Sequence, residues 1–304
     1  MIELKNNRLV FSFPEVHSRA RISISFKRTL RIPDDGKDYP LPAGIGTFPM
    51  QHVDDFKDRV PPNWSEHGGV MLPMYQSEAM WINFDGYYPF AIKVAAGKIN
   101  AVSGEAWRSG LHRTPQDYMV TPDQPWLDGY SVEKGIIRQF VAEPFGLGYT
   151  AEEQITGKAE TGGIQIAAYP MKRASYDKYF PPRQKENDAG ICYSMRDSNV
   201  CFSEMGLAPG GRMKQEIMED TYEMDDWDIE NTSRSFIHIC NSMTWRQITG
   251  VNPPSVPLTN EEYAKAGIPW YLYYDESVKK LPGSATLAKL KSLGDFLQEK
   301  KGVS

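Results

Sequence analysis

Short segments in which apolar and polar residues alternate recur along most of the chain. Residues 19–30 read RARISISFKRTL, with isoleucine or phenylalanine at every second position of the central part. A period of two is typical of a strand that buries one face. Further strands are predicted on similar grounds at residues 71–84, 87–102, 136–142, 164–169, 213–217 and 235–240, and Gly97-Lys98 is predicted to be a hairpin turn.

The stretch from Gly135 to Lys172 is the longest one in which strand-like pieces, turn glycines and polar residues alternate without interruption. We interpret it as the central hairpin of a β core, formed by strands at 136–142 and 164–169. Its polar residues are candidates for ligand binding, and a structural hydrogen-bond network is the alternative. The candidates are Gln139, Glu152, Glu153, Gln154 and Lys172.

Adjacent glutamates do not make a paired acid and base. Glu152 and Glu153 would point to opposite faces of a strand, or about 100° apart on a helix. From a regular helix or strand, the two carboxylates therefore cannot act together as acid and base on the same substrate bond.

The character of the chain changes after residue 250. Thr259 and Glu262 form the pattern of a capping box for a short helix that Gly267 ends. Residues 284–301 predict an amphipathic helix, with leucines at 287, 290, 293 and 297 on one side. We therefore expect a mainly β, sandwich-like fold of two packed sheets with long loops and a C-terminal amphipathic helix, with an α+β fold as the fallback. Residues 1–250 would form the core domain, and residues 251–304 an extension whose helices pack on it.

Composition and charge narrow the classes of protein. The 304 residues are 40% hydrophobic and 24% charged, which is the usual balance of a globular protein. A net charge of -5 disfavours a nucleic-acid partner, and no uncharged apolar run approaches the ~20 residues of a membrane span. The N-terminus lacks the pattern of a secretory signal, and the three cysteines show no CxxC spacing. We expect a cytoplasmic protein with reduced thiols.

Motifs for known chemistries are absent, and we expect no cofactor: the chain contains no GxSxG, P-loop or HExxH pattern. A weak set of metal ligands is His52, His67 and Glu66, whose spacing matches no known signature. The acidic residues between 219 and 228 are either oxygen ligands for a divalent cation or a solvated loop.

Aromatic and basic side chains leave two further alternatives open. Trp81 and Trp126 are candidates for lining an apolar ligand pocket, although such residues more often belong to the core. The basic residues of the strand at 19–31 form either a surface for an anionic ligand or a solvated face with ion pairs. They are Arg19, Arg21, Lys27, Arg28 and Arg31.

Several long stretches resemble a widespread family of bacterial and fungal proteins that has no established activity. They include MLPMYQSEAMW, KVAAGKINAVSG, PQDYMVTPDQPWLDG, IRQFVAEPFGLGYTAEEQITG, GIQIAAYPMK and the tail GIPWYLYYDE. The similarity covers most of the chain from Pro40 to Leu293. The resemblance implies one integrated domain and brings no catalytic residues.

Three functions are compatible with the sequence. The first is a protein that binds a small molecule or a protein partner, without catalysis, through its aromatic loops and the central polar cluster. The second is a metal-assisted hydrolase that uses His52, His67 and nearby carboxylates. The third is a self-assembling structural protein, for which a homo-oligomer is expected.

Overall fold

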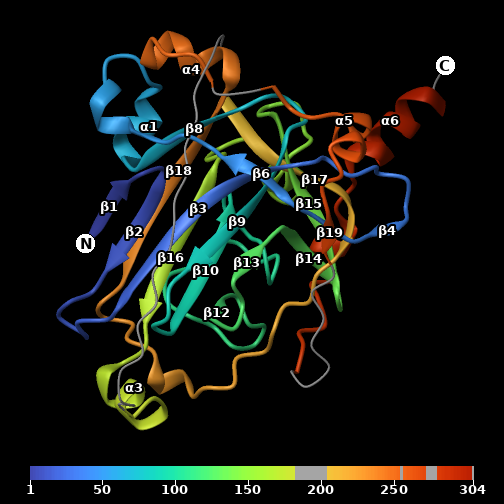
Figure 1. Ribbon diagram of the computed structural model, residues 1–304. Helices are drawn as coiled ribbons and strands as arrows, with labels where there is room; N and C mark the ends of the chain where they lie inside the picture. The colour runs from blue at the N-terminus through green and yellow to red at the C-terminus, as the bar shows by residue number, and fades with distance from the viewer. Residues whose placement is uncertain (182–203, 254–255, 272–278, 303–304) are drawn as a thin grey trace.

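The protein is mainly β, with short helices at the periphery (Figure 1). The computed structural model describes residues 1–181, 204–253, 256–271 and 279–302. The strands are β1 (Ile2–Lys5), β2 (Arg8–Ser12), β3 (Arg21–Thr29), β4 (Asp38–Tyr39), β5 (Leu41–Pro42), β6 (Gly44–Thr47), β7 (Gln51–His52), β8 (Val70–Met74), β9 (Ala79–Asp85), β10 (Phe90–Ala96), β11 (Ile99–Asn100), β12 (Met119–Thr121), β13 (Trp126–Leu127), β14 (Gly129–Glu133), β15 (Ile136–Pro144), β16 (Ile164–Pro170), β17 (Glu204–Lys214), β18 (Ser233–Asn241) and β19 (Trp270–Tyr271).

The helices are short. The α-helices are α1 (Pro62–His67), α2 (Ala151–Thr156), α3 (Arg173–Tyr179), α4 (Ser242–Thr249), α5 (Asn260–Lys265) and α6 (Leu293–Gly302), and the 3-10 helices are η1 (Val53–Phe56), η2 (Met224–Asp226) and η3 (Leu287–Lys289). In Figure 1, α1 and α4 lie together at one end of the molecule and α3 at the opposite end. None of the helices in the described ranges is both long enough and apolar enough to traverse a lipid bilayer.

One large sheet holds seventeen of the strands, and β5 and β19 form a second, two-stranded sheet. The pairing runs β1–β2–β3–β9–β15–β17–β18–β16–β10–β12, and every pair in this path is antiparallel. Two links in this path are short, since β9–β15 and β17–β18 share only two residue pairs each. These short links join the β1–β2–β3–β9 part to the β18–β16–β10–β12 part.

The two parts of the large sheet pack face to face around one core. Ile24 and Phe26 of β3 belong to the same buried cluster as Ile92 of β10 and Ile166 of β16. The rings of Phe13 and Phe90, with centroids 5.7 Å apart, also join the two parts. The expected mainly β fold with two packed layers and a C-terminal helix is thus confirmed, and the layers belong to one continuous sheet.

Several elements lie where the local sequence pattern predicts them. Strand β3 falls within the predicted 19–30 segment, and its alternating apolar residues are fully buried. Helix α5 begins at the predicted capping box, in which the Thr259 hydroxyl accepts from the Glu262 N–H and the Glu262 carboxylate accepts from the Thr259 N–H. The predicted Gly97-Lys98 turn joins β10 to β11, where Gly97 has a left-handed φ of 56°.

The central stretch 135–172 is not the predicted hairpin. Among the described residues, β15 pairs with β14, β17 and β9, whereas β16 pairs with β10 and β18. Glu152 and Glu153 lie between the two strands, as expected, and they belong to α2, where Thr150 and Glu153 form a capping box. The segment is therefore a strand–helix–strand unit whose two strands lie in different parts of the sheet.

The C-terminal helix is shorter than predicted. Residues 287–289 form the single turn η3, Leu290 is extended, and α6 begins at Leu293, where the Ser292 hydroxyl and the Asp295 carboxylate cap its first turn. The extended backbone at Leu290 lets that side chain reach the core. Leu297, expected on the apolar side, is 57% exposed.

The segment before α6 completes the core of the sheet. Leu287 is fully buried in the same cluster as the strands. The Ser284 hydroxyl donates to the backbone oxygen of Ser103, and its N–H donates to that of Ser131. Leu287 and Leu290 therefore belong to the main hydrophobic core, and Leu281 packs against it.

Candidate functional site

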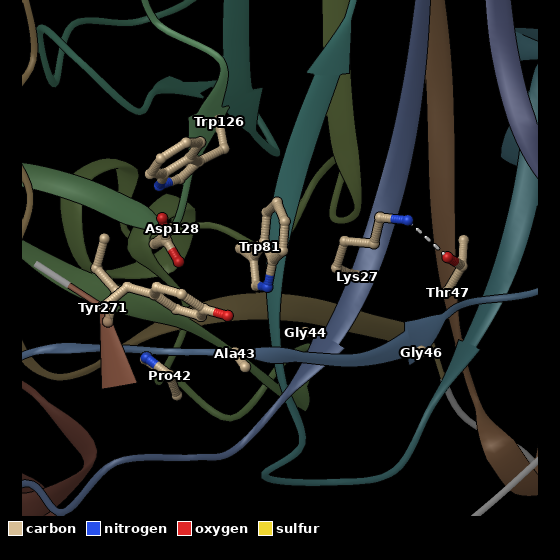
Figure 2. A pocket seen from close by; sticks show the side chains of 11 residues that line it. Lys27, Pro42, Ala43, Gly44, Gly46, Thr47, Trp81, Trp126, Asp128 and Tyr271 are labelled. Carbon is tan, nitrogen blue, oxygen red and sulfur yellow. Dashed lines mark hydrogen bonds between the residues drawn. The ribbon is translucent and has the colours of Figure 1, made fainter. Parts of the chain in front are cut away.

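A pocket of about 640 Å³ lies on the outer face of β3 and β9, opposite the core. Strand β6, β13 and the small β5–β19 sheet form its other walls (Figure 2). Its volume lies within the ~300–1,000 Å³ of small-molecule sites. We call it the aromatic pocket; its lining residues are Lys27, Leu41, Pro42, Ala43, Gly44, Gly46, Thr47, Trp81, Trp126, Asp128 and Tyr271.

Two indoles form the apolar wall. Trp81 of β9 and Trp126 of β13 have ring centroids 6.4 Å apart, with their planes inclined by 66°. A Cβ atom at Gly44 would lie 3.1 Å from the Trp81 ring, so the absence of a side chain there lets β6 approach the indole closely. The Trp81 Nε1–H is buried and has no acceptor among the described residues. A flat ring can lie on one indole face and meet the edge of the other.

Lys27 supplies a positive charge to the pocket. Its position in the alternation of β3 points it away from the core, and its ammonium group donates to the Thr47 hydroxyl across β3–β6 at 2.8 Å. Burial and the neighbouring Arg8 guanidinium lower the pKa of Lys27, while Asp85 opposes them. No carboxylate oxygen of the described residues lies within 4.0 Å of this ammonium, because Asp85 pairs with Arg8 instead.

Asp128 supplies the second ionisable group. Its side chain is 2% exposed, and Gln215 brackets it: the Gln215 amide donates to Oδ2 at 2.8 Å and accepts from the Asp128 backbone N–H at 3.0 Å. Burial raises the pKa of Asp128 to about 7, and the hydrogen bond from Gln215 lowers this pKa only in part. Figure 2 shows Asp128 with Trp126 and Tyr271, and Lys27 on the other side of Trp81.

The β5–β19 wall is held together by Tyr263 of α5 and is tied to the large sheet by Thr29 of β3. The Tyr263 hydroxyl accepts from the backbone N–H of Ala43 at 2.7 Å and donates to the Pro269 oxygen at 2.8 Å. The Thr29 hydroxyl donates to the Ala43 oxygen at 3.0 Å. One buried tyrosine therefore holds both strands of the small sheet beside the pocket.

The candidates of the central stretch hold the structure together and lie outside the aromatic pocket. Gln139 is fully buried, accepts from the Ile32 N–H and donates to the Leu30 oxygen. The buried Glu152 carboxylate accepts from the N–H groups of Thr161 and Gly162, and burial raises its pKa.

The other polar candidates are likewise paired. Glu153 accepts from the N–H groups of Gly146, Gly148 and Thr150 as part of the α2 cap. Gln154 exchanges two hydrogen bonds with the backbone of Lys291, and Lys172 pairs with Asp225 on the surface. The structure does not bring these five candidates together at one cavity.

The proposed metal ligands are not gathered either. His52 and Glu66 are exposed, and His67 stacks on the Phe236 ring with centroids 4.5 Å apart. Within the described ranges, no three His, Cys, Asp or Glu side chains form a group that could hold a metal ion, and this includes the acidic stretch 219–228.

The remaining predictions have mixed outcomes. Cys240 is buried in the core. Cys192 and Cys201 lie outside the described residues, and so do residues 272–276 of the tail segment GIPWYLYYDE. Of the basic residues on β3, Arg28 is buried in an ion pair with Glu78 at 2.8 Å, and only Lys27 lines the aromatic pocket.

The sequence patterns do not single out Asp128, because an Asp-Gly pair is typical of a turn. Gly129 instead begins β14, and a Cβ atom there would lie 1.9 Å from the Arg138 oxygen on β15. The absence of a side chain at Gly129 thus allows β14 and β15 to lie close together. Trp81 and Trp126 are brought together in the pocket, where they had been named as candidates.

Comparisons of the chain with protein-family models, curated proteins and solved structures give no match. The resemblance drawn from the quoted stretches therefore stays an expectation, and function has to be argued from the pocket itself.

Proposed function

We propose that the protein binds a small organic molecule with a flat ring body in the aromatic pocket. The observation that carries the proposal is the composition of this one cavity: two indoles and a tyrosine form its walls, and an ammonium and a carboxyl group are its polar ends. Ligand sites are typically apolar and aromatic with a few placed polar groups. Binding without catalysis is the function these features favour.

The polar groups of the pocket support the same proposal. Keeping an ionisable carboxyl group such as Asp128 buried beside a cavity costs stability. So does the half-buried Lys27 ammonium, which has no counter-ion among the described residues. Both costs are reduced when a ligand supplies matching groups. The metal-hydrolase alternative receives no comparable support from the described residues.

Isothermal titration calorimetry with two-ring aromatic probes tests the proposal. Naphthalene-2-carboxylate and 2-naphthol should bind with saturable heats, and Trp126→Ala should weaken both about tenfold through the loss of ring contact. Tyr87→Ala, which removes a ring that is 91% exposed and outside the pocket, is the matched control. If neither probe binds at millimolar concentration, or if Trp126→Ala leaves binding unchanged, the proposal fails.

A further inference from the structure

We propose that the ligand of the aromatic pocket is a planar ring carboxylate, held by Lys27 through its carboxylate and by Asp128 through an O–H or N–H group at its far end. This inference rests on the proposed function and names the class of ligand. Three observations support it: among the described residues the Lys27 ammonium has no carboxylate within 4.0 Å, Asp128 Oδ1 accepts no hydrogen bond, and the Trp81 indole lies between the two groups.

The Lys27 ammonium favours an anion. An ammonium group has three donors, and in the described residues only the Thr47 hydroxyl accepts one of them. The neighbouring Arg8 adds positive potential that its own partner, Asp85, offsets only in part. A ligand carboxylate at this end would supply both the missing acceptors and the missing charge.

The Asp128 carboxyl group favours a donor. Gln215 occupies Oδ2, while Oδ1 accepts no hydrogen bond from the described residues although the side chain lines the pocket. The amide orientation of Gln215 is fixed, because its oxygen accepts from the Asp128 backbone N–H. A ligand O–H or N–H is the natural partner of the remaining oxygen.

The position of the two ends makes the ligand bifunctional. Lys27 lies on one side of the Trp81 indole, and Asp128 lies on the other with Trp126 and Tyr271 (Figure 2). A ligand that meets both must span the indole with a flat body. An organic cation in the aromatic cage is disfavoured, because it would share the cavity with an unneutralised ammonium.

A set of matched probes measured by calorimetry at pH 8 tests the inference. We expect naphthalene-2-carboxylate to bind at least tenfold tighter than naphthalene-2-carboxamide, and 6-hydroxynaphthalene-2-carboxylate to bind about fivefold tighter still. Lys27→Met should abolish the preference for the carboxylate. In Asp128→Asn, Gln215 retains the single side-chain oxygen and the new NH₂ group faces the pocket. The wild type should therefore prefer the 6-hydroxy compound to 6-methoxynaphthalene-2-carboxylate, which can only accept at that end, and the variant should lose this preference.

The outcomes separate the inference from the proposed function. If the naphthalenes bind but the carboxamide equals the carboxylate, or if Lys27→Met keeps the preference, the pocket is a ligand site of another class and the inference fails. Tighter binding of 2-naphthyltrimethylammonium than of the carboxylate would also overturn it, in favour of a cation site. If none of the naphthalenes binds, the proposed function itself fails.

Discussion

Replacing Asp128 by asparagine should remove one specific part of the pH dependence of stability. The carboxyl group is 2% exposed, and its pKa in the folded protein is about 7, against 3.8 for an unperturbed aspartate. Between these values the folded protein keeps the proton while the unfolded chain loses it. The contribution of Asp128 to stability is therefore fully present below about pH 3.8 and is lost as the pH rises through 7.

The size of the effect follows from the two pKa values. At 1.36 kcal/mol per pKa unit, the complete loss is about 4 kcal/mol, of which about 2–3 kcal/mol falls between pH 5 and pH 8. The amide introduced by Asp128→Asn cannot ionise, and it keeps the shape of the side chain and a hydrogen bond to Gln215. We therefore expect the stability of the variant relative to the wild type to rise by about 2–3 kcal/mol between these two pH values.

Urea denaturation of both proteins, followed by tryptophan fluorescence and circular dichroism, measures the difference. Other buried carboxyl groups, such as those of Glu78 and Glu152, titrate in both proteins and cancel. Asp58→Asn, which removes an exposed carboxylate, serves as the control and should stay within about 0.5 kcal/mol at every pH. A stability difference between Asp128→Asn and wild type that stays constant from pH 5 to pH 8 would refute the reasoning.

Four further substitutions test buried contacts by the same denaturation assay, and Leu297→Ala is the control among them. Lys93→Met should cost about 3–5 kcal/mol, because it removes the buried ammonium that lies 2.6 Å from the buried Asp117 carboxylate and leaves only the more exposed Arg108 guanidinium, at 4.0 Å, and His112 beside it; a loss below about 1 kcal/mol would contradict this. Gln139→Leu should cost about 2–4 kcal/mol, since two buried backbone groups lose their partner. Leu287→Ala should cost about 2–5 kcal/mol and Leu297→Ala almost nothing, and equal losses would show that both leucines face the core.

The sequence predicts best what is decided locally. The alternation of β3 and the capping box of α5 depend on residues within a few positions of each other, and both were found where expected. The partners of a strand depend on residues far away. The pattern of 136–142 is the same whether that strand pairs with 164–169 or, as observed, with β17 some seventy residues later.

The aromatic pocket was only partly predictable for the same reason. The alternation of β3 places Lys27 opposite the buried Phe26, so its outward direction could be foreseen. The residues that form the pocket around Lys27 could not be predicted, because β6 lies about twenty residues away in the sequence and Tyr271 more than two hundred. Asp128 could not be identified from the sequence, because an Asp-Gly pair is typical of a turn. Only the position of β15 shows that Gly129 is needed for the close approach of β14 to the Arg138 backbone.

The burial of Leu287 and the hydrogen bonds of Ser284 have a consequence for folding during synthesis. Strands that bind this segment, such as β14, are translated about 150 residues earlier. At ~5–20 residues per second, those strands wait on the order of ten seconds or more for the side chain that closes their core. During that interval the nascent chain exposes apolar surface, and we expect chaperone dependence to be greatest for ribosome-bound chains that stop just before residue 280.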